Sequence, residues 1–387
     1  MEPIIIYNHI MICMMTSYKI GGFYMRNKYK ICVYAICKNE EKFVDRFMDH
    51  VSSADIVVVV DTGSTDNTIS KLRERGAIVY SMDITPFRFD YSRNECLKYI
   101  PSDIDICVSA DLDDVIEDGW RVYLEKAWTS GTTRGSYLYN WSLNADGSPS
   151  VQYTWSRIHA RHGYKWIYPT HEILEYQGAG YEKEVYITGM VYNHKPDASK
   201  NRSLNLPLLK LAIKENPNSS RNLYYLGREY MFENNWDECI STLKNYLNQP
   251  TSNWEEERSS AMRFISKSYY EKKEILNAKK WLHKAISESI SSREPYIALS
   301  LLAYNEEDWI SVYYYANEAL KIKEKSFSFA NDANAWDYSP YDLAALGCYN
   351  LNIIGKSIEF SEKAIKLDPS NERLLNNHKI YLSSLPI

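Results

Sequence analysis

The chain has 387 residues, with 45 basic and 50 acidic side chains and a formal net charge of −5. This balance excludes the strongly basic surface that would hold nucleic acid or an acidic membrane, so no nucleic acid partner is expected. The length allows two or three domains of ordinary size, each with its own core.

Residues 1–28 contain apolar patches, but polar residues such as Asn8, His9 and Lys19 interrupt them. We expect this segment to be a poorly ordered N-terminal extension. No later run approaches the ~18 apolar residues of a membrane span. The seven cysteines include no C-x-x-C pair. Together these features predict a cytoplasmic protein without a membrane span.

Apolar, β-branched runs alternate with amphipathic segments from Tyr29 onward. Strands are predicted at residues 29–37, 54–61 and 77–84, and helices at 40–51 and 67–76. Continuous apolar strands bounded by turn residues are typical of strands covered on both faces. The first half therefore predicts an α/β domain with a mainly parallel sheet.

Polar clusters follow several of these strands. "CKNEE" ends the strand at 29–37, "DTGSTDNT" ends the strand at 54–61, and "DLDD" follows the apolar run "IDICV" at 104–108. In open α/β sheets, ligands bind at the carboxyl ends of the strands. We expect these three clusters to form one site.

The acidic cluster "DLDD" contains Asp111 and Asp113 at i, i+2, a spacing that points both side chains to one side at the end of a strand. Two carboxylates on one side suit Mg2+ or Mn2+, especially when substrate phosphates complete the coordination. Alternatively, Asp113 and Asp114 cap a helix that begins at Val115.

Strand patterns give way to helical ones at about residue 201. The tetratricopeptide pattern of Leu-Gly, Tyr, Ala and Pro at fixed offsets recurs, with Leu226 and Gly227 in the first unit and Leu346 and Gly347 in the last. Units of this kind stack because no helix pair buries its apolar face alone. A generic helical bundle is the alternative.

The segments "VVVVDTGSTDNT", "SRNECL" and "SADLDD", in this order, resemble the nucleotide-sugar elements of family 2 glycosyltransferases, which have the GT-A fold. "RIHARHGYKWIYPTHEIL" and "VYNHKPDASKNRSLNLPLL", followed by the helical repeats, are similar to a subgroup that joins this domain to tetratricopeptide repeats. Bacteriocin S-glycosyltransferases and related bacterial and phage proteins share the layout. The resemblance implies an α/β GT-A-like domain at residues 29–200, followed by an all-α tetratricopeptide-repeat solenoid at residues 201–387.

The resemblance also implies roles for residues at the strand ends. Asp61 would accept a hydrogen bond from the uracil or ribose of a nucleotide diphosphate sugar, or else serve only to form the turn before Gly63. Arg93 would contact the base or the diphosphate. Asp111 would hold the ribose and Asp113 the metal, although Leu112 replaces the usual small residue between them and the adjacent Asp114 leaves the ligand open. The nucleotide pocket would be lined by Ala35, Cys37, Lys38, Asn39 and Glu40.

Acceptor activation requires a general base. Glu172 in "WIYPTHEIL" aligns with the acid of the family's acceptor-side motif, so we expect it to be the catalytic base, with His171 beside it. Alternatively, Glu172 favours a helix N-terminus. His194 in "YNHKP" matches a histidine that completes the metal site in many such enzymes, or it is an ordinary surface residue. Trp155 and Trp166 could stack on a sugar or fill the core, and we favour the core for Trp155.

Together with these residues, the resemblance implies a metal-dependent glycosyltransferase, and inversion is what the family implies. It would move a sugar from a nucleotide diphosphate sugar, in particular a UDP-sugar, to a protein, peptide or glycan acceptor. The repeats would dock the acceptor, a partner, or a second copy of the chain in a homodimer. Two alternatives stay open: a repeat-based binding module whose GT-A domain is inactive, and a nucleotidyltransferase, which would need an early glycine-rich basic loop that "AICKNEE" is not.

Overall fold

The computed structural model describes residues 17–20, 23–26, 28–144, 146–197 and 203–385. Within the N-terminal segment, two short strands pair antiparallel, β1 (Ser17–Ile20) and β2 (Phe23–Arg26). The expectation of a poorly ordered N-terminal extension stays a prediction. The expectation for residues 1–16 lies outside the described residues.

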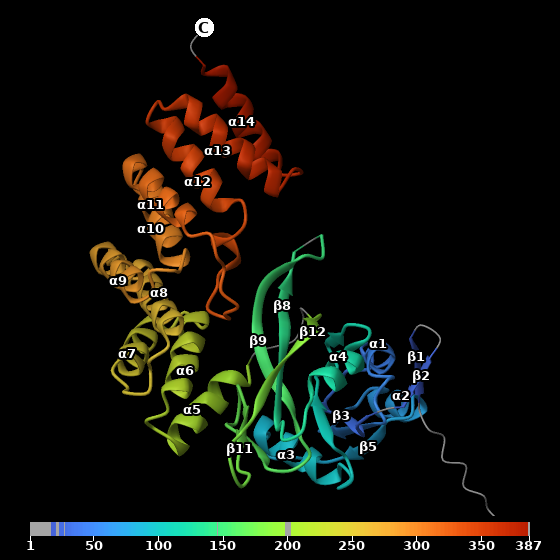
Figure 1. Ribbon diagram of the computed structural model, residues 1–387. Coiled ribbons are helices and arrows are strands. Elements are labelled where there is room, and N and C mark those ends of the chain that lie inside the picture. Colours follow the sequence, from blue (N-terminus) through green and yellow to red (C-terminus); the bar gives the residue numbers. More distant parts are fainter. Residues whose placement is uncertain (1–16, 21–22, 27, 145, 198–202, 386–387) are drawn as a thin grey trace, which may run out of the picture.

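An eight-stranded sheet forms the first half of the described chain, in the order β5-β4-β3-β6-β9-β8-β12-β7 (Figure 1). Strands β3 to β6 are parallel, whereas β9 is antiparallel to both β6 and β8. The sheet is therefore mixed, but β12 is also parallel to β8, so most pairings are parallel, as predicted, and β9 and β7 are the antiparallel strands. Its strands are β3 (Ile31–Cys37), β4 (Ile56–Asp61), β5 (Ile78–Ser81), β6 (Ile106–Ser109), β7 (Asp114–Ile116), β8 (Arg134–Leu143), β9 (Pro149–Ala160) and β12 (Glu184–His194).

Helices cover both faces of the parallel part of the sheet, as its continuous apolar strands predict. Alternate residues of β3 divide between two cores: Ile31, Val33 and Ala35 pack with helices α1, α2 and α4, while Cys32 and Tyr34 pack with α3 and the β10–β11 hairpin. These elements are α1 (Val44–His50), α2 (Thr68–Glu74), α3 (Phe89–Tyr99), α4 (Trp120–Ala127), β10 (Tyr164–Ile167) and β11 (Ile173–Tyr176).

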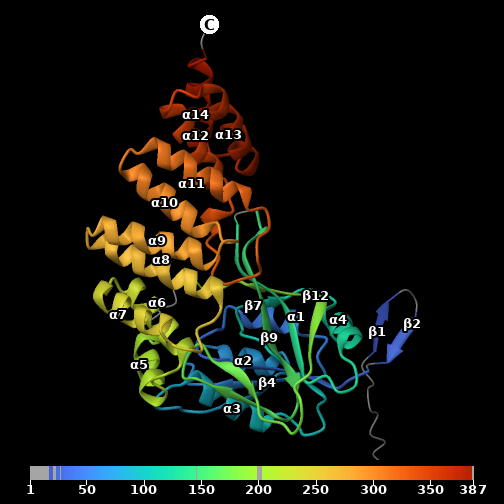
Figure 2. The same cartoon turned by 60° about the vertical axis from the view of Figure 1, so that its left-hand side comes forward.

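The second half is helical and forms a column of antiparallel helix pairs, with α14 farthest from the sheet (Figures 1 and 2). This confirms a sheet domain followed by a helical repeat region. The helices are α5 (Asn205–Glu215), α6 (Ser220–Phe232), α7 (Trp236–Leu247), α8 (Glu255–Glu271), α9 (Ile275–Glu288), α10 (Glu294–Asn305), α11 (Trp309–Lys321), α12 (Ser339–Asn350), α13 (Ile354–Leu367) and α14 (Glu372–Ser383).

Small residues of the repeat pattern lie where neighbouring helices approach closely. A Cβ atom on Gly227 would stand 2.4 Å from the Cγ of Leu243 on the paired helix, and one on Gly347 would stand 2.8 Å from the backbone nitrogen of Tyr313. Such distances are too short for any side chain, so glycine is required there for packing. No helix among the described residues is both long and apolar enough to cross a membrane.

The helical column packs against the sheet domain at several points. Arg88 forms an ion pair with Glu215 at 2.5 Å, which joins the start of α3 to α5. The β8–β9 hairpin extends alongside the column toward the loop of residues 322–338 that precedes α12 (Figures 1 and 2). In that loop, the Lys325 Nζ donates to the main-chain oxygen of Ser150 at 2.6 Å. The sheet domain and the helical column are therefore in direct contact.

Candidate functional site

A cavity of about 1210 Å³ lies where the carboxyl end of β3 meets helix α6, and we call it the site cavity. Parallel strands end at one edge of a sheet, so the segments after β3 and β6 meet there. Its walls come from the ends of these strands, from the inner face of β8 and β9, from the loop before β11, and from the helical region. Of the predicted site residues, Cys37, Lys38, Asn39, Glu40, Arg93, Asp111, Asp113, His171, Glu172 and His194 line it.

Two predicted residues do not line the cavity. Ala35 is fully buried in the core, and its contact with a nucleotide stays a prediction. The Asp61 carboxylate is 1 % exposed and accepts hydrogen bonds from the backbone nitrogens of Gly63 and Ser64, at 3.0 and 2.9 Å, and from the Ser64 hydroxyl. The structure thus shows the turn-forming alternative for Asp61, and its contact with a nucleotide stays a prediction.

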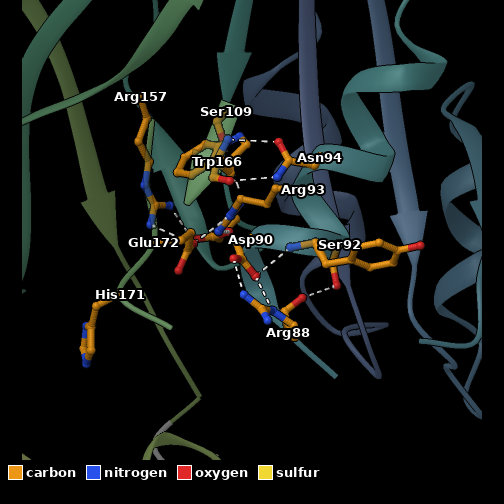
Figure 3. A network of polar contacts seen from close by, with 12 residues as sticks. Arg88, Asp90, Ser92, Arg93, Asn94, Ser109, Arg157, Trp166, His171 and Glu172 are labelled. Carbon is orange, nitrogen blue, oxygen red and sulfur yellow. Dashed lines mark hydrogen bonds and ion pairs between the residues drawn. The ribbon is translucent and has the colours of Figure 1, made fainter. Parts of the chain in front are cut away.

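Arg93, Arg157 and Glu172, which are buried and labelled in Figure 3, form an ion-pair network with the half-buried Asp111 at the wall of the cavity. Arg93 donates from Nη2 to Asp111 at 2.7 Å and from Nε to Glu172 at 2.7 Å. Arg157 reaches the other Asp111 oxygen at 2.8 Å and lies 3.6 Å from Glu172. Burial disfavours ionisation of Asp111, but the two guanidinium groups outweigh it and hold the pKa of this carboxyl well below its usual range. Two positive and two negative charges therefore balance.

Asp113 and His194 meet at the mouth of the cavity. The pairing of β7 with β12 places His194 opposite Asp114, and the His194 Nε2 lies 3.7 Å from the Asp113 Oδ2. Burial lowers the pKa of His194, but hydrogen bonding and charge from Asp113 outweigh it, so the net shift is upward. The ring stacks on Trp141, with 4.5 Å between centroids.

The donor chemistry at this pair fits a divalent cation. Among the described residues, no cluster of three or more His, Cys, Asp or Glu side chains is arranged to hold a metal. Mg2+ and Mn2+ are commonly held by one or two protein ligands, with substrate phosphates and water completing the shell. Asp113 and His194 could supply these two protein ligands.

Asp114 turns away from the cavity. It accepts hydrogen bonds from the Tyr139 hydroxyl at 2.8 Å and from the Asp111 backbone nitrogen at 3.0 Å. Burial, followed by the charges of Asp111 and Asp113, raises its pKa to about 7. The alternative of a helix beginning at Val115 is wrong, because strand β7 starts at Asp114. Of the three acids, Asp113 is the one placed beside His194.

The segment before β11 carries Glu172 and His171 in different directions (Figure 3). Glu172 points into the ion-pair network, whereas the His171 ring stacks on Tyr225 of α6 with 4.0 Å between centroids. His171 has a positive φ of 50°, as does Tyr168 with 77°, so this short segment bends sharply. Because strand β11 follows Glu172 directly, the alternative of a helix N-terminus at Glu172 is wrong.

The two tryptophans differ in how deeply they are buried. Trp166 is 1 % exposed and donates from its indole nitrogen to the Tyr34 hydroxyl at 3.0 Å, deep in the core. Trp155 is half-buried and lines the cavity, with the Arg157 guanidinium 3.7 Å above its ring. Trp155, expected in the core, packs against the core and also lines the cavity, as do Trp141 and Trp166.

Sequence reasoning missed the contribution of the helical region to the cavity. Arg221, Tyr225, Arg228 and Phe232 of α6 line it, as does Phe329 of the loop before α12. The α6 residues stand at i, i+4, i+7 and i+11, which is the spacing of one helix face. That spacing predicts that the four side chains share one face of the helix. The sequence does not show that this face lines the cavity of the sheet domain.

No family model and no curated protein matches the chain. Solved structures match it in part. MamA is 17 % identical over 43 % of this chain and 89 % of its own, with a TM-score of 0.35. YrrB, described as a TPR protein with an unusual peptide-binding site, is 14 % identical over 45 % of this chain and 81 % of its own, with a TM-score of 0.33.

The sheet domain also has partial matches. Glucosyl-3-phosphoglycerate synthase from Mycobacterium tuberculosis, solved with Mn2+, UDP and glucosyl-3-phosphoglycerate, is 21 % identical over 30 % of this chain and 45 % of its own, with a TM-score of 0.25. Each of these likenesses covers less than half of the chain. A functional assignment has to come from the site itself.

Proposed function

We propose that the chain is a metal-dependent glycosyltransferase that uses a nucleotide diphosphate sugar, with UDP-sugars as the first candidates. One observation carries this proposal: Asp113 and His194, far apart in the sequence, lie 3.7 Å apart beside a cavity at the carboxyl ends of parallel strands. Such an edge is where α/β sheets bind nucleotides. A carboxylate and an imidazole there suit a cation that bridges a diphosphate.

In this proposal the donor extends along the sheet edge, with its nucleotide against residues 37–40 and its diphosphate near Asp113 and His194. A bound Mn2+ or Mg2+ would stabilise the leaving diphosphate as a Lewis acid. The acceptor nucleophile forms a bond to the anomeric carbon as the bond to the diphosphate oxygen breaks. Single displacement with inversion is what the resemblance to family 2 enzymes implies.

Glu172 is proposed to take the proton from the acceptor. Its two ion-pair contacts both use Oε1, so the proton would be accepted at Oε2. Arg93 and Arg157 hold the side chain in place, which fixes the position of the base. The same two arginines hold Asp111, so one network orients the donor side and the acceptor side together.

A second candidate is a binding module that holds the nucleotide sugar without turning it over. The balanced network favours this candidate in one respect, since the arginines Arg93 and Arg157 engage both Asp111 and Glu172. Product formation separates the two candidates. Hydrolysis or transfer of the donor sugar would support the glycosyltransferase. Nucleotide binding without product formation would support the binding module.

The test is a panel of nucleotide sugars with Mn2+, read by thermal unfolding. A ligand at ~100 times its dissociation constant should stabilise the protein by about 2.7 kcal/mol. A UDP-sugar that stabilises only in the presence of Mn2+ supports the proposal. If no nucleotide sugar in the panel raises the melting temperature, with or without metal, the proposal fails.

A further inference from the structure

Four side chains of helix α6 form a stripe that faces the site cavity: Arg221, Tyr225, Arg228 and Phe232. Other residues of the helix, among them Leu223, Leu226 and Met231, pack within the repeat, and Tyr225 does both, since it belongs to the repeat core and also lines the cavity. The stripe therefore brings two guanidinium groups of the helical region to the cavity.

The two arginines of the stripe differ in their partners. Arg221 donates from Nε and Nη2 to the main-chain oxygen of His171, at 3.3 and 3.2 Å. It thus ties α6 to the segment that carries Glu172. The Arg228 guanidinium lies 4.6 Å from the centroid of Tyr225, and its Nε is buried with no hydrogen-bond partner among the described residues.

Arg228 also lacks a matching carboxylate. Within the described part of the chain, no acid lies within 4.0 Å of its guanidinium. Glu257 on α8 interacts electrostatically with Arg228 from a distance. The Oε1 of Glu257 accepts a hydrogen bond from the Tyr246 hydroxyl at 2.9 Å. A half-buried cation without a partner carries a desolvation cost that an anionic ligand would offset.

The other four arginines that line the cavity have partners. Arg93 and Arg157 are paired with the two carboxylates of the network. Arg134 forms an ion pair with Glu182 at 2.6 Å. Arg221 is held by a main-chain oxygen. Arg221 and Arg228 both lack a carboxylate partner, but within the described residues Arg228 is the cavity guanidinium that has neither an ion pair nor a hydrogen bond.

We propose that Arg228 binds an anionic oxygen group of the acceptor, a phosphate or a carboxylate. This inference rests on the proposed function, because that proposal places the donor along residues 37–40 and leaves Arg228 to the acceptor. The ring of Phe329 lies 6.2 Å from that of Tyr225 and 6.2 Å from that of Tyr153, so the wall around Arg228 is aromatic. The acceptor class is therefore one whose anionic group is attached to an apolar or aromatic part.

The test uses phenyl phosphate and benzoate as probes, with binding measured by calorimetry on the full chain. Arg228→Gln should weaken binding of the matching probe about 10- to 100-fold, the loss expected for a charge-assisted hydrogen bond. Arg228→Lys should recover part of it, because it restores the charge without the planar fork. The control is Lys244→Gln on α7, where a half-buried cation lies over Tyr269 outside the cavity, and it should leave binding unchanged.

UDP with Mn2+ is titrated into the same variants. The inference predicts that Arg228→Gln binds UDP as tightly as wild type. It is overturned if Arg228→Gln binds both aromatic anions as well as wild type, if wild type binds neither, or if the variant loses UDP affinity to the same extent. A third outcome is that wild type binds an aromatic anion through Arg228 but does not bind UDP. This outcome would overturn the acceptor assignment and the proposed function together, and only an anion-binding site would remain.

Discussion

The Glu172→Gln variant tests the assignment of the base. Glu172 is 7 % exposed, and its Oε1 accepts from the Arg93 Nε at 2.7 Å. Glutamine has nearly the same shape and keeps an oxygen that can accept from Arg93, but it cannot take a proton from the acceptor. The substitution therefore removes basicity while it preserves the main contact.

Two magnitudes follow. Loss of a general base typically slows turnover about 100- to 10,000-fold, and 100-fold corresponds to about 2.7 kcal/mol in the barrier. The variant also removes one of two negative charges that balance Arg93 and Arg157. Because the hydrogen bond survives, we expect a loss in the free energy of unfolding of about 1 to 3 kcal/mol. The melting temperature should fall.

Glu125→Gln is the matched control. Glu125 is also 7 % exposed and accepts from an arginine Nε, that of Arg121 at 2.9 Å, but it lies on α4 outside the site cavity. Both variants should lose stability to a similar extent. Only Glu172→Gln should lose turnover.

Single-turnover transfer is measured well below both melting temperatures, and donor affinity is measured by calorimetry. The account predicts unchanged donor affinity for both variants and a rate at least ~100-fold lower for Glu172→Gln alone. If Glu172→Gln keeps more than about a tenth of the wild-type rate when chemistry is limiting, Glu172 is a counter-ion and the base lies elsewhere.

Two further predictions concern stability. Gly227→Ala should lower the free energy of unfolding by about 1 to 3 kcal/mol, because the new Cβ would stand 2.4 Å from Leu243. Gly355→Ala on α13, with open space around it, should raise the free energy of unfolding by about 0.5 to 1 kcal/mol. Equal urea midpoints for the two variants would contradict this packing. Asp114 binds its proton more tightly in the native state, since its pKa of about 7 exceeds the unfolded value of about 3.9, so its contribution to stability falls as pH rises from about 4 to 7. In metal-free protein, the stability of Asp114→Asn relative to wild type should therefore rise across that window, and a constant difference in urea unfolding would show that Asp114 is already ionised.

The parallel strands and the polar clusters behind them were predictable from the sequence. Continuous apolar runs at 29–37 and 54–61 give β3 and β4, and the carboxyl ends of parallel strands must meet at one edge. The helix pairs were predictable for a similar reason, since their small residues recur at fixed offsets. Both features depend on local pattern.

The remaining parts depend on contacts between distant segments. The long β8–β9 hairpin, which makes the sheet mixed, pairs antiparallel with β6, and no local signal specifies that partner. Arg157 became part of the site only because β9 runs beside Asp111. Asp61 and Glu40 were equally good candidates by sequence, yet one closes its own turn and the other faces the cavity.

Binding of UDP with and without Mn2+ tests the central claim most directly, measured by calorimetry on wild type, Asp113→Ala and Asp118→Ala. Asp118 is a fully exposed acid near the same turn and serves as the control. The account predicts that Mn2+ tightens UDP binding in wild type and in Asp118→Ala, and that Asp113→Ala loses this metal-dependent gain while it keeps its fold. If Asp113→Ala binds UDP and Mn2+ as tightly as wild type, the proposed metal and donor site is contradicted.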